Sequence, residues 1–477
     1  MGFRKDFVWG AATAAYQIEG AAFEEGKGLN VWDVYCNADK STTVSTSDWD
    51  VGTDTVSSAE EKEPNIFNDE NGNIACDHYH RYKEDVKLMA ELGIKAYRFS
   101  INWARVIPNG TGKINESGAK FYSDLVDELL AYGIEPYVTL FHWEYPQALE
   151  EQGGWLNSES SEWFSEYAKT VVELFGDRVK YYMTFNEFQC FVNLGYKSGL
   201  HAPGRTYSDA ELVRLSHHIL MAHGKAVKAL RKANPNCLVS VAPCGRVYMP
   251  SEPTPENVEA ARKKYFQYDI SNFVGSVGFW SDAIVLGSYS EEYLKDAEQY
   301  LPETWKEDLK NVIAQPLDFY CQNLYNGYYG EADEKGEFKL SRIEEGTPHT
   351  AKKAGWYVRP EVLYWGPKFL CDRYKLPLYI TENGAAMCDC VSLDGKVHDP
   401  ARMDYIHRYL LSLRKLADEG YDLRGYFVWS FLDNFEWKDG YFVRFGIVWV
   451  DYQTLVRIPK DSYYWYKDVI KQNGDKL

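Results

Sequence analysis

Eight short segments rich in β-branched and aromatic residues recur along the whole chain, and they constrain the fold more than any other feature. They cover residues 7–11, 96–101, 134–143, 180–186, 238–243, 318–325, 376–382 and 423–431. Segments of this length and composition are typical of buried strands. Between them lie segments with apolar residues at helical spacing, such as 83–93, 121–133 and 405–420, each of which ends at a glycine. The sequence therefore predicts an alternation of strands and helices.

Two folds accommodate such an alternation, an open doubly wound sheet and a closed eight-stranded barrel. The first strand segment is not followed by the glycine-rich phosphate-binding loop of the open dinucleotide-binding fold. Polar and charged residues instead stand at the C-terminal ends of several strand segments, where barrel enzymes place their chemistry. We therefore predict an α/β fold of the (β/α)8 TIM-barrel class.

The length of 477 residues is compatible with one barrel that carries long loops. Residues 40–65 are rich in Ser, Thr, Asp and Glu without an apolar period, as in a linker between domains. Only one strand segment precedes them, which is too little to form a domain, so an insertion in a βα-loop is the better interpretation. We predict a single domain over residues 1–477.

The charge balance indicates which partners to expect. Lysine and arginine number 52 against 70 acidic residues, a net charge of −18. Such a surface repels nucleic acid and anionic lipid, and favours neutral or cationic small molecules as ligands. The N-terminal segment lacks a leucine-rich signal core, and no stretch approaches the roughly 18 apolar residues of a membrane span. Nine scattered cysteines are typical of free thiols in a reducing compartment. We predict a soluble cytoplasmic protein with no nucleic-acid or membrane partner; the oligomeric state leaves no signal in the sequence.

Two glutamates end strand segments. Glu187 stands in YYMTFNEF and Glu382 in LPLYITENG, at the ends of the fourth and seventh segments. A closed barrel would bring both to one face, where two carboxylates can divide the acid and nucleophile roles of glycoside hydrolysis. A strand-end carboxylate can also cap a helix or pair with a surface cation, but the presence of two, each beside an asparagine, favours the catalytic interpretation.

Aromatic and polar residues gather at other strand ends, with His142 and Trp143 after the third segment and Trp429, Glu436 and Trp437 after the eighth. Sugars need this mixture, because their C–H faces stack on indole rings while their hydroxyls need directional donors and acceptors. The sequence therefore favours a carbohydrate ligand.

Metal ligation is the rival interpretation of the histidines and cysteines. His78 and His80 are two residues apart at the start of a helical segment and so do not share a face. Cys388 and Cys390 lack the second pair that zinc sites usually have. We predict no metal site, and we expect packing or hydrogen-bonding roles for His217, His218 and His223.

Seven motifs in a fixed order resemble a known family. They are FVWGAATAAYQIEG, YRFSINWARVIPNG, VTLFHWEYPQAL, TFNEF, HAPG, YITENGAA and WSFLDNFEW. In order and spacing they resemble glycoside hydrolase family 1, the β-glucosidases and their relatives, over about residues 7–466. Its members are retaining enzymes on a (β/α)8 barrel, which agrees with the fold predicted from the periodicity.

The resemblance implies roles for individual residues. Glu187 would be the general acid/base and Glu382 the nucleophile, with Asn186 at the sugar 2-hydroxyl and with Arg98 and Tyr325 as hydrogen-bond donors to the nucleophile. The remaining matches belong to substrate binding: Gln17, His142, Asn323, Trp356, Trp429, Glu436, Trp437 and Phe445. Among these, Gln17 and Glu436 would hold the edge of the sugar with the 3-, 4- and 6-hydroxyls, and Trp356 would lie under the leaving group. No cofactor is implied, and the expected partner is a small β-glycoside.

Four departures from the family pattern bear on leaving-group preference. Phe188 replaces the usual proline after the acid/base, so we expect an altered backbone there and a changed aglycone wall. The chain reads CQNLY at 321–325, where the family commonly has GLNYY. Ser290 replaces a proline, and the 40–65 insertion has no common counterpart. None of the four removes a catalytic group.

Three other functions remain open. A 6-phospho-β-glycosidase would need a phosphate site near Glu436, whose carboxylate would repel it. A non-catalytic carbohydrate-binding barrel would be expected to lack one of the two glutamates. A metal-dependent sugar isomerase would need clustered acids and histidines at strand ends. Among β-glycosidases, the sequence leaves glucose, galactose and fucose open, as it does the aglycone and the extent of transglycosylation.

Overall fold

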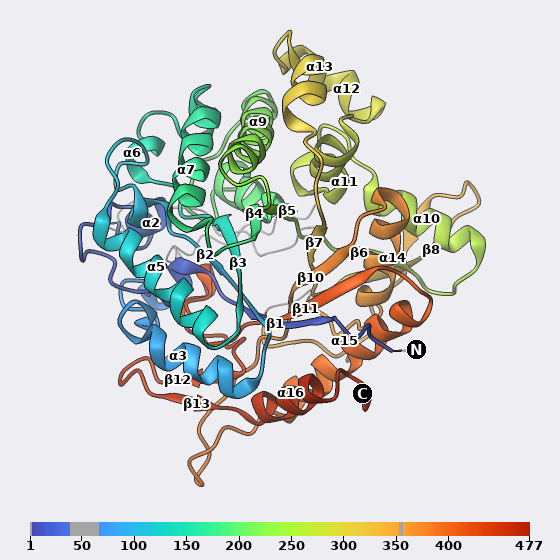
Figure 1. Ribbon diagram of the computed structural model, residues 1–477. Coiled ribbons are helices and arrows are strands. Elements are labelled where there is room, and N and C mark those ends of the chain that lie inside the picture. Colours follow the sequence, from blue (N-terminus) through green and yellow to red (C-terminus); the bar gives the residue numbers. More distant parts are fainter. Residues whose placement is uncertain (1, 39–65, 353–355) are drawn as a thin grey trace.

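The computed structural model describes residues 2–38, 66–352 and 356–477 (Figure 1). Eight parallel strands form one sheet in the order β5-β4-β3-β2-β1-β11-β10-β7. Their bounds are β1 Val8–Ala12, β2 Ala96–Ser100, β3 Glu135–Phe141, β4 Tyr181–Asn186, β5 Leu238–Ala242, β7 Tyr320–Asn323, β10 Leu378–Asn383 and β11 Leu423–Trp429. Every predicted strand segment is present, with ends that differ by at most two residues.

The two outer strands of this sheet, β5 and β7, meet through hydrogen bonds. The Ser240 hydroxyl donates to the carbonyl of Phe319 at 2.8 Å, and the backbone N–H of Asn323 donates to the carbonyl of Pro243 at 2.9 Å. The sheet thus closes on itself, and the predicted (β/α)8 barrel is confirmed. The C-terminal ends of all eight strands face one way, so one rim of the barrel collects the residues that follow them.

Helices surround the barrel (Figure 1). The longer ones are α3 His78–Leu92, α5 Glu116–Ala131, α7 Ser160–Phe175, α9 Asp209–Ala233, α10 Pro255–Phe266, α14 Val362–Tyr374, α15 Pro400–Asp418 and α16 Asp461–Lys471. The shorter ones are α1 Ala15–Ile18, α2 Val31–Asn37, α4 Trp103–Val106, α6 Gln147–Glu150, α8 Phe188–Val192, α11 Val277–Ser281, α12 Glu291–Ala297 and α13 Trp305–Asp308. None of the helices in the described ranges is both long and apolar enough to cross a membrane.

The three predicted helices begin about five residues earlier than expected. Their first turns are polar, as in HYHRY of α3, so the apolar period that marks a helix starts only in the second turn. Their ends were predicted within two residues. Gly93 closes α3 in the left-handed conformation with φ of 90°, which a glycine adopts without steric cost.

Two small sheets extend the loops of the barrel. One contains β6 Val247–Pro250, β8 Gly327–Ala332 and β9 Phe338–Leu340, and the other pairs β12 Val448–Val450 with β13 Arg457–Pro459. These elements and the short helices account for much of the length beyond a minimal barrel. The predicted 40–65 insertion lies outside the described residues, and the single-domain organisation stays a prediction.

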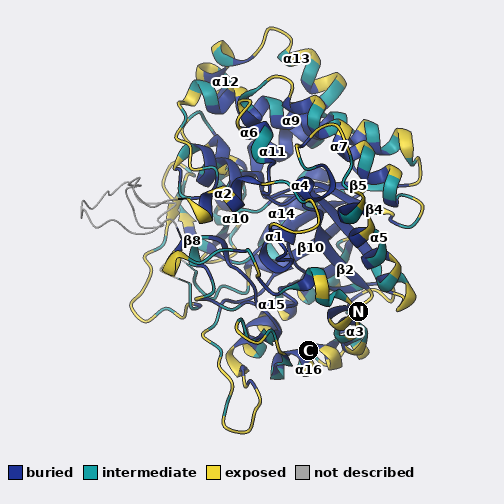
Figure 2. Cartoon of the chain, turned by 90° about the vertical axis from the view of Figure 1, so that its left-hand side faces the viewer, coloured by how far each residue is buried: buried dark blue, intermediate teal, exposed yellow. Residues whose placement is uncertain are grey.

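Large aromatic side chains fill the interior of the barrel toward the N-terminal ends of the strands. Tyr137 and Tyr181 stack with their ring centroids 4.1 Å apart, and Phe427 lies 5.1 Å from Tyr137. Figure 2 shows the barrel strands as the buried centre of the molecule. The N-terminal residues pack against the chain end, where Trp9 donates to Asn473 at 3.0 Å. Because these side chains block the N-terminal end of the barrel, a ligand can enter only at the C-terminal ends of the strands.

Candidate active site

The two predicted carboxylates lie in one cavity of about 710 Å³ at the C-terminal rim of the barrel. Glu382 is the penultimate residue of β10, and Glu187 follows β4 and precedes α8. They come from distant parts of the chain and meet because the barrel closes. Glu187 is 7% exposed and Glu382 is 3% exposed, so both are largely withdrawn from water while still lining the cavity. A cavity of this size accommodates a small ligand such as a sugar unit with its leaving group.

Two donors hold the carboxylate of Glu382. Arg98 Nη1, from β2, lies 2.5 Å from Oε1, and the Tyr325 hydroxyl lies 2.7 Å from Oε2. Burial raises the pKa of Glu382, Arg98 lowers it, and the negative charge of Glu187 raises it again. The two donors favour the ionised form of Glu382 and limit the rise in its pKa that burial and Glu187 cause.

The side-chain amide of Asn186 forms hydrogen bonds with three other residues of this site. Its Oδ1 accepts from Arg98 Nη2 at 2.6 Å and from Asn323 Nδ2 at 2.9 Å. Its Nδ2 must therefore be the atom that faces His142 Nε2 at 3.0 Å, which makes Nε2 the acceptor and places the imidazole proton on Nδ1. Burial, with a smaller contribution from Arg98, holds the pKa of His142 well below its ordinary value. The histidine is thus a neutral donor, and its Nδ1 has no protein partner in the described residues.

Asn323 connects Asn186 to the carboxylate of Glu187. Its Nδ2 also donates to Glu187 Oε1 at 2.8 Å, while its Oδ1 accepts from the Thr381 hydroxyl at 2.7 Å. Thr381 precedes Glu382 on β10, so the orientation of Glu187 depends on the strand that carries the other carboxylate. One continuous set of hydrogen bonds therefore fixes both acids relative to each other.

Aromatic rings form two walls of the cavity. On one side Trp143 lies 4.6 Å from Trp437, and His142 stacks at 5.8 Å from Trp429 with an interplanar angle of 18°. On the other side Tyr325, Trp356 and Phe445 cluster with centroid separations of 5.2 to 6.2 Å. These ring faces offer stacking surfaces for sugar C–H groups, as the sequence predicted.

A charged cluster closes one end of the cavity. Gln17 Nε2 donates to Asn434 Oδ1 at 3.0 Å and to Glu436 Oε2 at 3.2 Å, which leaves Gln17 Oε1 without a partner in the described chain. Lys352 Nζ lies 2.8 Å from Glu436 Oε1 and 3.2 Å from Asp439 Oδ2. Burial opposes the charge on Lys352, but Glu436 and Asp439 raise the pKa of Lys352 above its ordinary value. The cluster thus presents a carboxylate, a cation and an amide oxygen within one small space.

Three non-glycine residues of the cavity have left-handed backbone conformations. The φ angles are 87° for Trp143, 48° for Glu187 and 51° for Trp437. Such conformations cost of order 1–3 kcal/mol each and persist where the surroundings fix them, commonly at functional sites. Glu187 and Trp143 closely follow the ends of β4 and β3, and Trp437 lies in the loop after β11.

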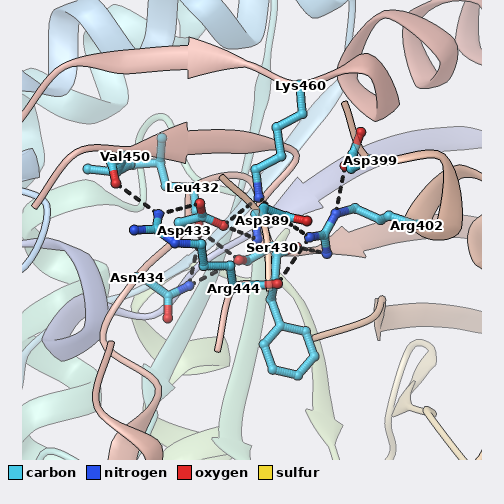
Figure 3. A network of polar contacts seen from close by, with 12 residues as sticks. Asp389, Asp399, Arg402, Ser430, Leu432, Asp433, Asn434, Arg444, Val450 and Lys460 are labelled. Atoms are coloured by element: carbon cyan, nitrogen blue, oxygen red, sulfur yellow. Dashed lines mark hydrogen bonds and ion pairs between the residues drawn. The ribbon is translucent and has the colours of Figure 1, made fainter. Parts of the chain in front are cut away.

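A buried ionic network lies behind the loop that carries Glu436 (Figure 3). Asp433 accepts from Lys460 Nζ at 2.8 Å and from Arg444 Nη1 at 2.7 Å. Lys460 also lies 2.5 Å from Asp389, which in turn pairs with Arg402 of α15. The network therefore joins the loops after β10 and β11 to the outer helices. It reaches the cavity through Asn434, whose Oδ1 accepts from Gln17 and whose Nδ2 donates to Ser430 at 3.0 Å.

Replacing Asp433 by Ala is expected to lower the free energy of unfolding by about 3–5 kcal/mol, because it leaves buried cations with too little compensating charge. The midpoint of thermal unfolding measures the loss. The exposed Asp394, which pairs with His398 in solvent, supplies the control, and Asp394→Ala should change the midpoint little. Equal midpoints for the two variants would contradict a stabilising role of the network.

The structure brings together all thirteen predicted site residues. Ten line the cavity, namely His142, Glu187, Asn323, Tyr325, Trp356, Glu382, Trp429, Glu436, Trp437 and Phe445. Arg98, Asn186 and Gln17 are fully buried just behind it and act on the lining residues through hydrogen bonds. Sequence reasoning missed Lys352, although the run TAKKAGWY places it four residues before Trp356.

The expected contribution of Phe188 to the aglycone wall is wrong. Phe188 is fully buried and stacks on Trp280 with ring centroids 4.8 Å apart, outside the lining of the cavity. The left-handed conformation of Glu187 explains this, because it turns the glutamate into the cavity while the next side chain starts α8 and points into the core. Asp282, eight residues before Ser290, has a structural partner, since Arg373 Nη2 lies 2.6 Å from its carboxylate.

His217, His218 and His223 have hydrogen-bond partners, as predicted, and so does His78. His78 pairs with Asp85 at 2.8 Å, and His217 lies 3.2 Å from Asp308. His218 contacts the carbonyl of Trp155 at 3.1 Å, and His223 contacts the Thr184 hydroxyl at 2.8 Å. Cys388 and Cys390 are exposed free thiols.

Comparisons with known proteins agree with this site. The model of glycosyl hydrolase family 1 matches residues 1–62 and 54–475. The β-glucosidase A of Thermotoga maritima is 40% identical over 473 residues, which cover 99% of this chain and 98% of that protein. A 1,4-β-D-glucan glucohydrolase of Thermotoga neapolitana is 39% identical over 475 residues and 99% of each chain. The solved structure of the Thermotoga maritima β-glucosidase in complex with noeuromycin matches with a TM-score of 0.85, 39% identity and 99% coverage of both chains. The chain therefore belongs to glycosyl hydrolase family 1 and is a glycoside hydrolase.

Proposed function

We propose that the protein is a retaining, exo-acting β-glucosidase that removes terminal non-reducing β-D-glucosyl residues from oligosaccharides or from aryl and alkyl glucosides. One observation carries this proposal. Two buried carboxyls share a sugar-sized cavity. Glu382 accepts from the Arg98 cation and the Tyr325 hydroxyl, which favour its ionised form, whereas Glu187 accepts from the neutral amide of Asn323. The names of the similar proteins support glucose as the sugar.

In the first step, Glu382 attacks the anomeric carbon and Glu187 gives its proton to the departing oxygen. The donors on Glu382 keep it ionised and aligned. Because its two oxygens are held from different strands, the attacking oxygen cannot rotate away. Asn186, fixed by Arg98 and Asn323, would meet the sugar 2-hydroxyl, where a hydrogen bond that tightens in the transition state lowers the barrier.

In the second step, water attacks the glycosyl-enzyme and Glu187 takes its proton. Formation of the ester removes the negative charge of Glu382, so the same residue that was an acid becomes a base. A second alcohol in place of water would give transglycosylation by the same route. The two steps each invert the anomeric carbon, and the product keeps the β configuration.

The far edge of the sugar would meet Gln17, His142 and Glu436. Within the described part of the chain, Gln17 Oε1 and His142 Nδ1 have no protein partner, and they are an acceptor and a donor respectively. An unpaired buried polar group costs about 1–3 kcal/mol, so sugar hydroxyls that complete these bonds bind with that gain. Trp356 on the opposite wall would lie beneath the leaving group.

The charges around Glu436 bear on the phosphorylated alternative. Glu436, Lys352 and Asp439 together carry one net negative charge. A 6-phosphate dianion placed there would meet this excess as well as the ionised Glu382. An unsubstituted glucoside is therefore favoured over its 6-phosphate. The presence of both carboxyls argues against a non-catalytic binding barrel.

We also propose that the enzyme works in the cytoplasm on a small β-glycoside, without nucleic-acid or membrane partners. Its nine cysteines are all free thiols, which supports a reducing compartment. Its net charge of −18 disfavours polyanions and anionic lipid surfaces.

The stereochemistry of hydrolysis tests the proposed function. Proton NMR during hydrolysis of an aryl β-D-glucoside should show β-glucose first, with the α-anomer appearing only at the rate of mutarotation. Initial rates on aryl β-glucoside, β-galactoside, β-fucoside and β-glucoside 6-phosphate should rank the glucoside first. First formation of α-glucose, or a preference for the phosphate, would refute the assignment.

Replacing Lys352 by Met is expected to raise KM for aryl β-glucosides about 10-fold with a smaller change in kcat, which corresponds to about 1.4 kcal/mol of binding. Burial raises the pKa of Glu436 and Lys352 opposes this effect, so the loss of the cation leaves a weaker acceptor for sugar hydroxyls. Lys352→Arg keeps the charge and should retain most of the affinity. A KM for Lys352→Met equal to that of the wild type would exclude this role.

A further inference from the structure

Two thiols lie beside Glu187 in a part of the cavity that the proposed hydrolysis does not use. Cys190 is the third residue after Glu187, on α8, and Cys244 follows β5. Their sulfur atoms are 3.5 Å apart. The two Sγ atoms and a carboxylate oxygen of Glu187 all lie within 4.8 Å of one another. Each element is anchored in the barrel, so this triangle is part of the rigid rim.

Solvent can reach the triangle. Cys190, Cys244 and Glu187 all line the 710 Å³ cavity, and both thiols are partly exposed. Of the four other cysteines that are fully buried in the described chain, Cys36, Cys76, Cys237 and Cys321, none lines this cavity. An ion that enters the cavity therefore meets this pair of thiols.

The spacing of the triangle matches the ligand shell of zinc. Zn–S bonds are about 2.3 Å long, so two sulfurs on a tetrahedral ion lie about 3.8 Å apart, close to the separation found here. A disulfide would need the sulfurs at about 2.05 Å, a much larger displacement. Two thiolates and one carboxylate leave a fourth position for water, the arrangement of an open zinc site.

We propose that Cys190, Cys244 and Glu187 form a site for a thiophilic divalent cation, zinc above all, and that its occupation inhibits the enzyme. Binding forms two Zn–S bonds and one Zn–O bond, and the two thiol protons leave to the buffer. When Glu187 is protonated, its proton leaves as well. The bound ion coordinates the Glu187 carboxylate, which can then neither protonate the leaving group nor activate water.

Both thiols carry their protons in the free enzyme. The contact with Cys190 lowers the pKa of Cys244, but burial and the neighbouring Glu187 and Glu382 raise it to about 11. The contact with Cys244 and burial raise the pKa of Cys190. An incoming ion must therefore displace both protons. A dication compensates the two thiolate charges that its binding creates, whereas a monovalent cation would leave one of them uncompensated.

Calorimetric titration of the wild-type enzyme with zinc chloride tests the site independently of the proposed hydrolysis. We expect one ion per chain and the release of at least two protons, measured in buffers of different ionisation enthalpy. Cobalt(II) in place of zinc should show a thiolate-to-metal charge-transfer band. Cys190→Ser and Cys244→Ser should each weaken zinc binding at least about 100-fold, and Glu187→Gln should weaken it measurably.

The matched control is the exposed pair Cys388 and Cys390, whose double replacement by serine should leave zinc binding unchanged. Should the serine variants fail to fold, mass spectrometry of the wild-type chain provides the same information. Zinc should protect Cys190 and Cys244 from alkylation by iodoacetamide and leave Cys388 reactive.

The inhibition experiment rests on the proposed function, whereas the zinc-binding experiments do not. Zinc should lower aryl β-glucosidase activity, and EDTA should restore it. Zinc binding that depends on Cys388 and Cys390, or the absence of binding at the cavity, would overturn the site. An activity loss that a phosphine reductant reverses and EDTA does not would identify a disulfide and overturn the metal assignment. Binding at Cys190 and Cys244 that leaves activity intact would overturn the inhibitory role.

Discussion

Replacing Glu382 by Ala is expected to lower kcat for aryl β-glucosides by about 10⁴-fold or more, the scale seen when an enzyme loses its nucleophile. Glu382 is the carboxylate that Arg98 and Tyr325 hold at 2.5 and 2.7 Å, and alanine leaves both donors without their acceptor. Initial rates measured at saturating substrate give the change. The exposed Glu361, whose carboxylate accepts from the Tyr329 hydroxyl at 2.6 Å, supplies the control, and Glu361→Ala should retain near-wild-type rates.

A small anion should restore part of this loss. The space vacated in Glu382→Ala faces the anomeric carbon and still contains the Arg98 cation, so azide can enter it and attack from that side. The product would be an α-glucosyl azide, because the variant performs one displacement instead of two. Turnover of the alanine variant near the wild-type value without any added anion would contradict the role of Glu382.

Replacing Glu187 by Ala is expected to cost about 10²–10⁴-fold in kcat/KM for substrates with poor leaving groups, the usual contribution of a general acid. A dinitrophenolate leaves without a proton, so an aryl glucoside of that kind should lose far less in the first step. A series of aryl glucosides that differ in the pKa of the released phenol measures the slope. The slope should be much steeper in the variant than in the wild type.

The control for Glu187 is the exposed Glu151, which contacts Gln147 at 3.1 Å on the outer surface. Glu151→Ala should leave both the rates and the slope unchanged. Equal losses for every leaving group in Glu187→Ala would argue that the residue positions the substrate and does not transfer a proton. That result would shift the acid role to another group of the cavity.

The barrel could be predicted because its signal is local and repeated. Each buried parallel strand is a short run of apolar residues, and the three predicted helices end within two residues of a glycine, such as Gly93 after α3. Strand ends were therefore placed within two residues. The starts of α3 and α15 were placed late, because polar first turns carry no apolar period.

The positions of Glu187 and Glu382 could be predicted for a different reason. A catalytic carboxylate at a strand end must follow an apolar run, so the change from apolar to acidic residues indicates its position in the sequence. The hydrogen bonds among Arg98, Asn186 and Asn323 depend on three strands meeting, and only the resemblance to a family indicated those residues before the fold was known.

Other features of the cavity have no local signal in the sequence. Lys352 reaches Glu436 across 84 positions of sequence, and the 3.5 Å approach of Cys190 to Cys244 joins residues 54 positions apart. Their meeting depends on the closure of the barrel. The direction of Phe188 was mispredicted because it depends on the left-handed backbone of Glu187, a conformation that non-glycine residues rarely adopt and that tertiary contacts must fix.

Trapping of the covalent intermediate tests the proposed mechanism most directly. A 2-deoxy-2-fluoro-β-D-glucoside with a dinitrophenyl leaving group should accumulate as a glycosyl-enzyme, since the fluorine slows both displacements while the good leaving group speeds the first. Mass spectrometry of the digested protein should then find one fluoroglucosyl group on the peptide that contains Glu382, attached to that residue. A label on another residue, or no label together with release of α-glucose from the unsubstituted substrate, would contradict the double displacement and the role of Glu382.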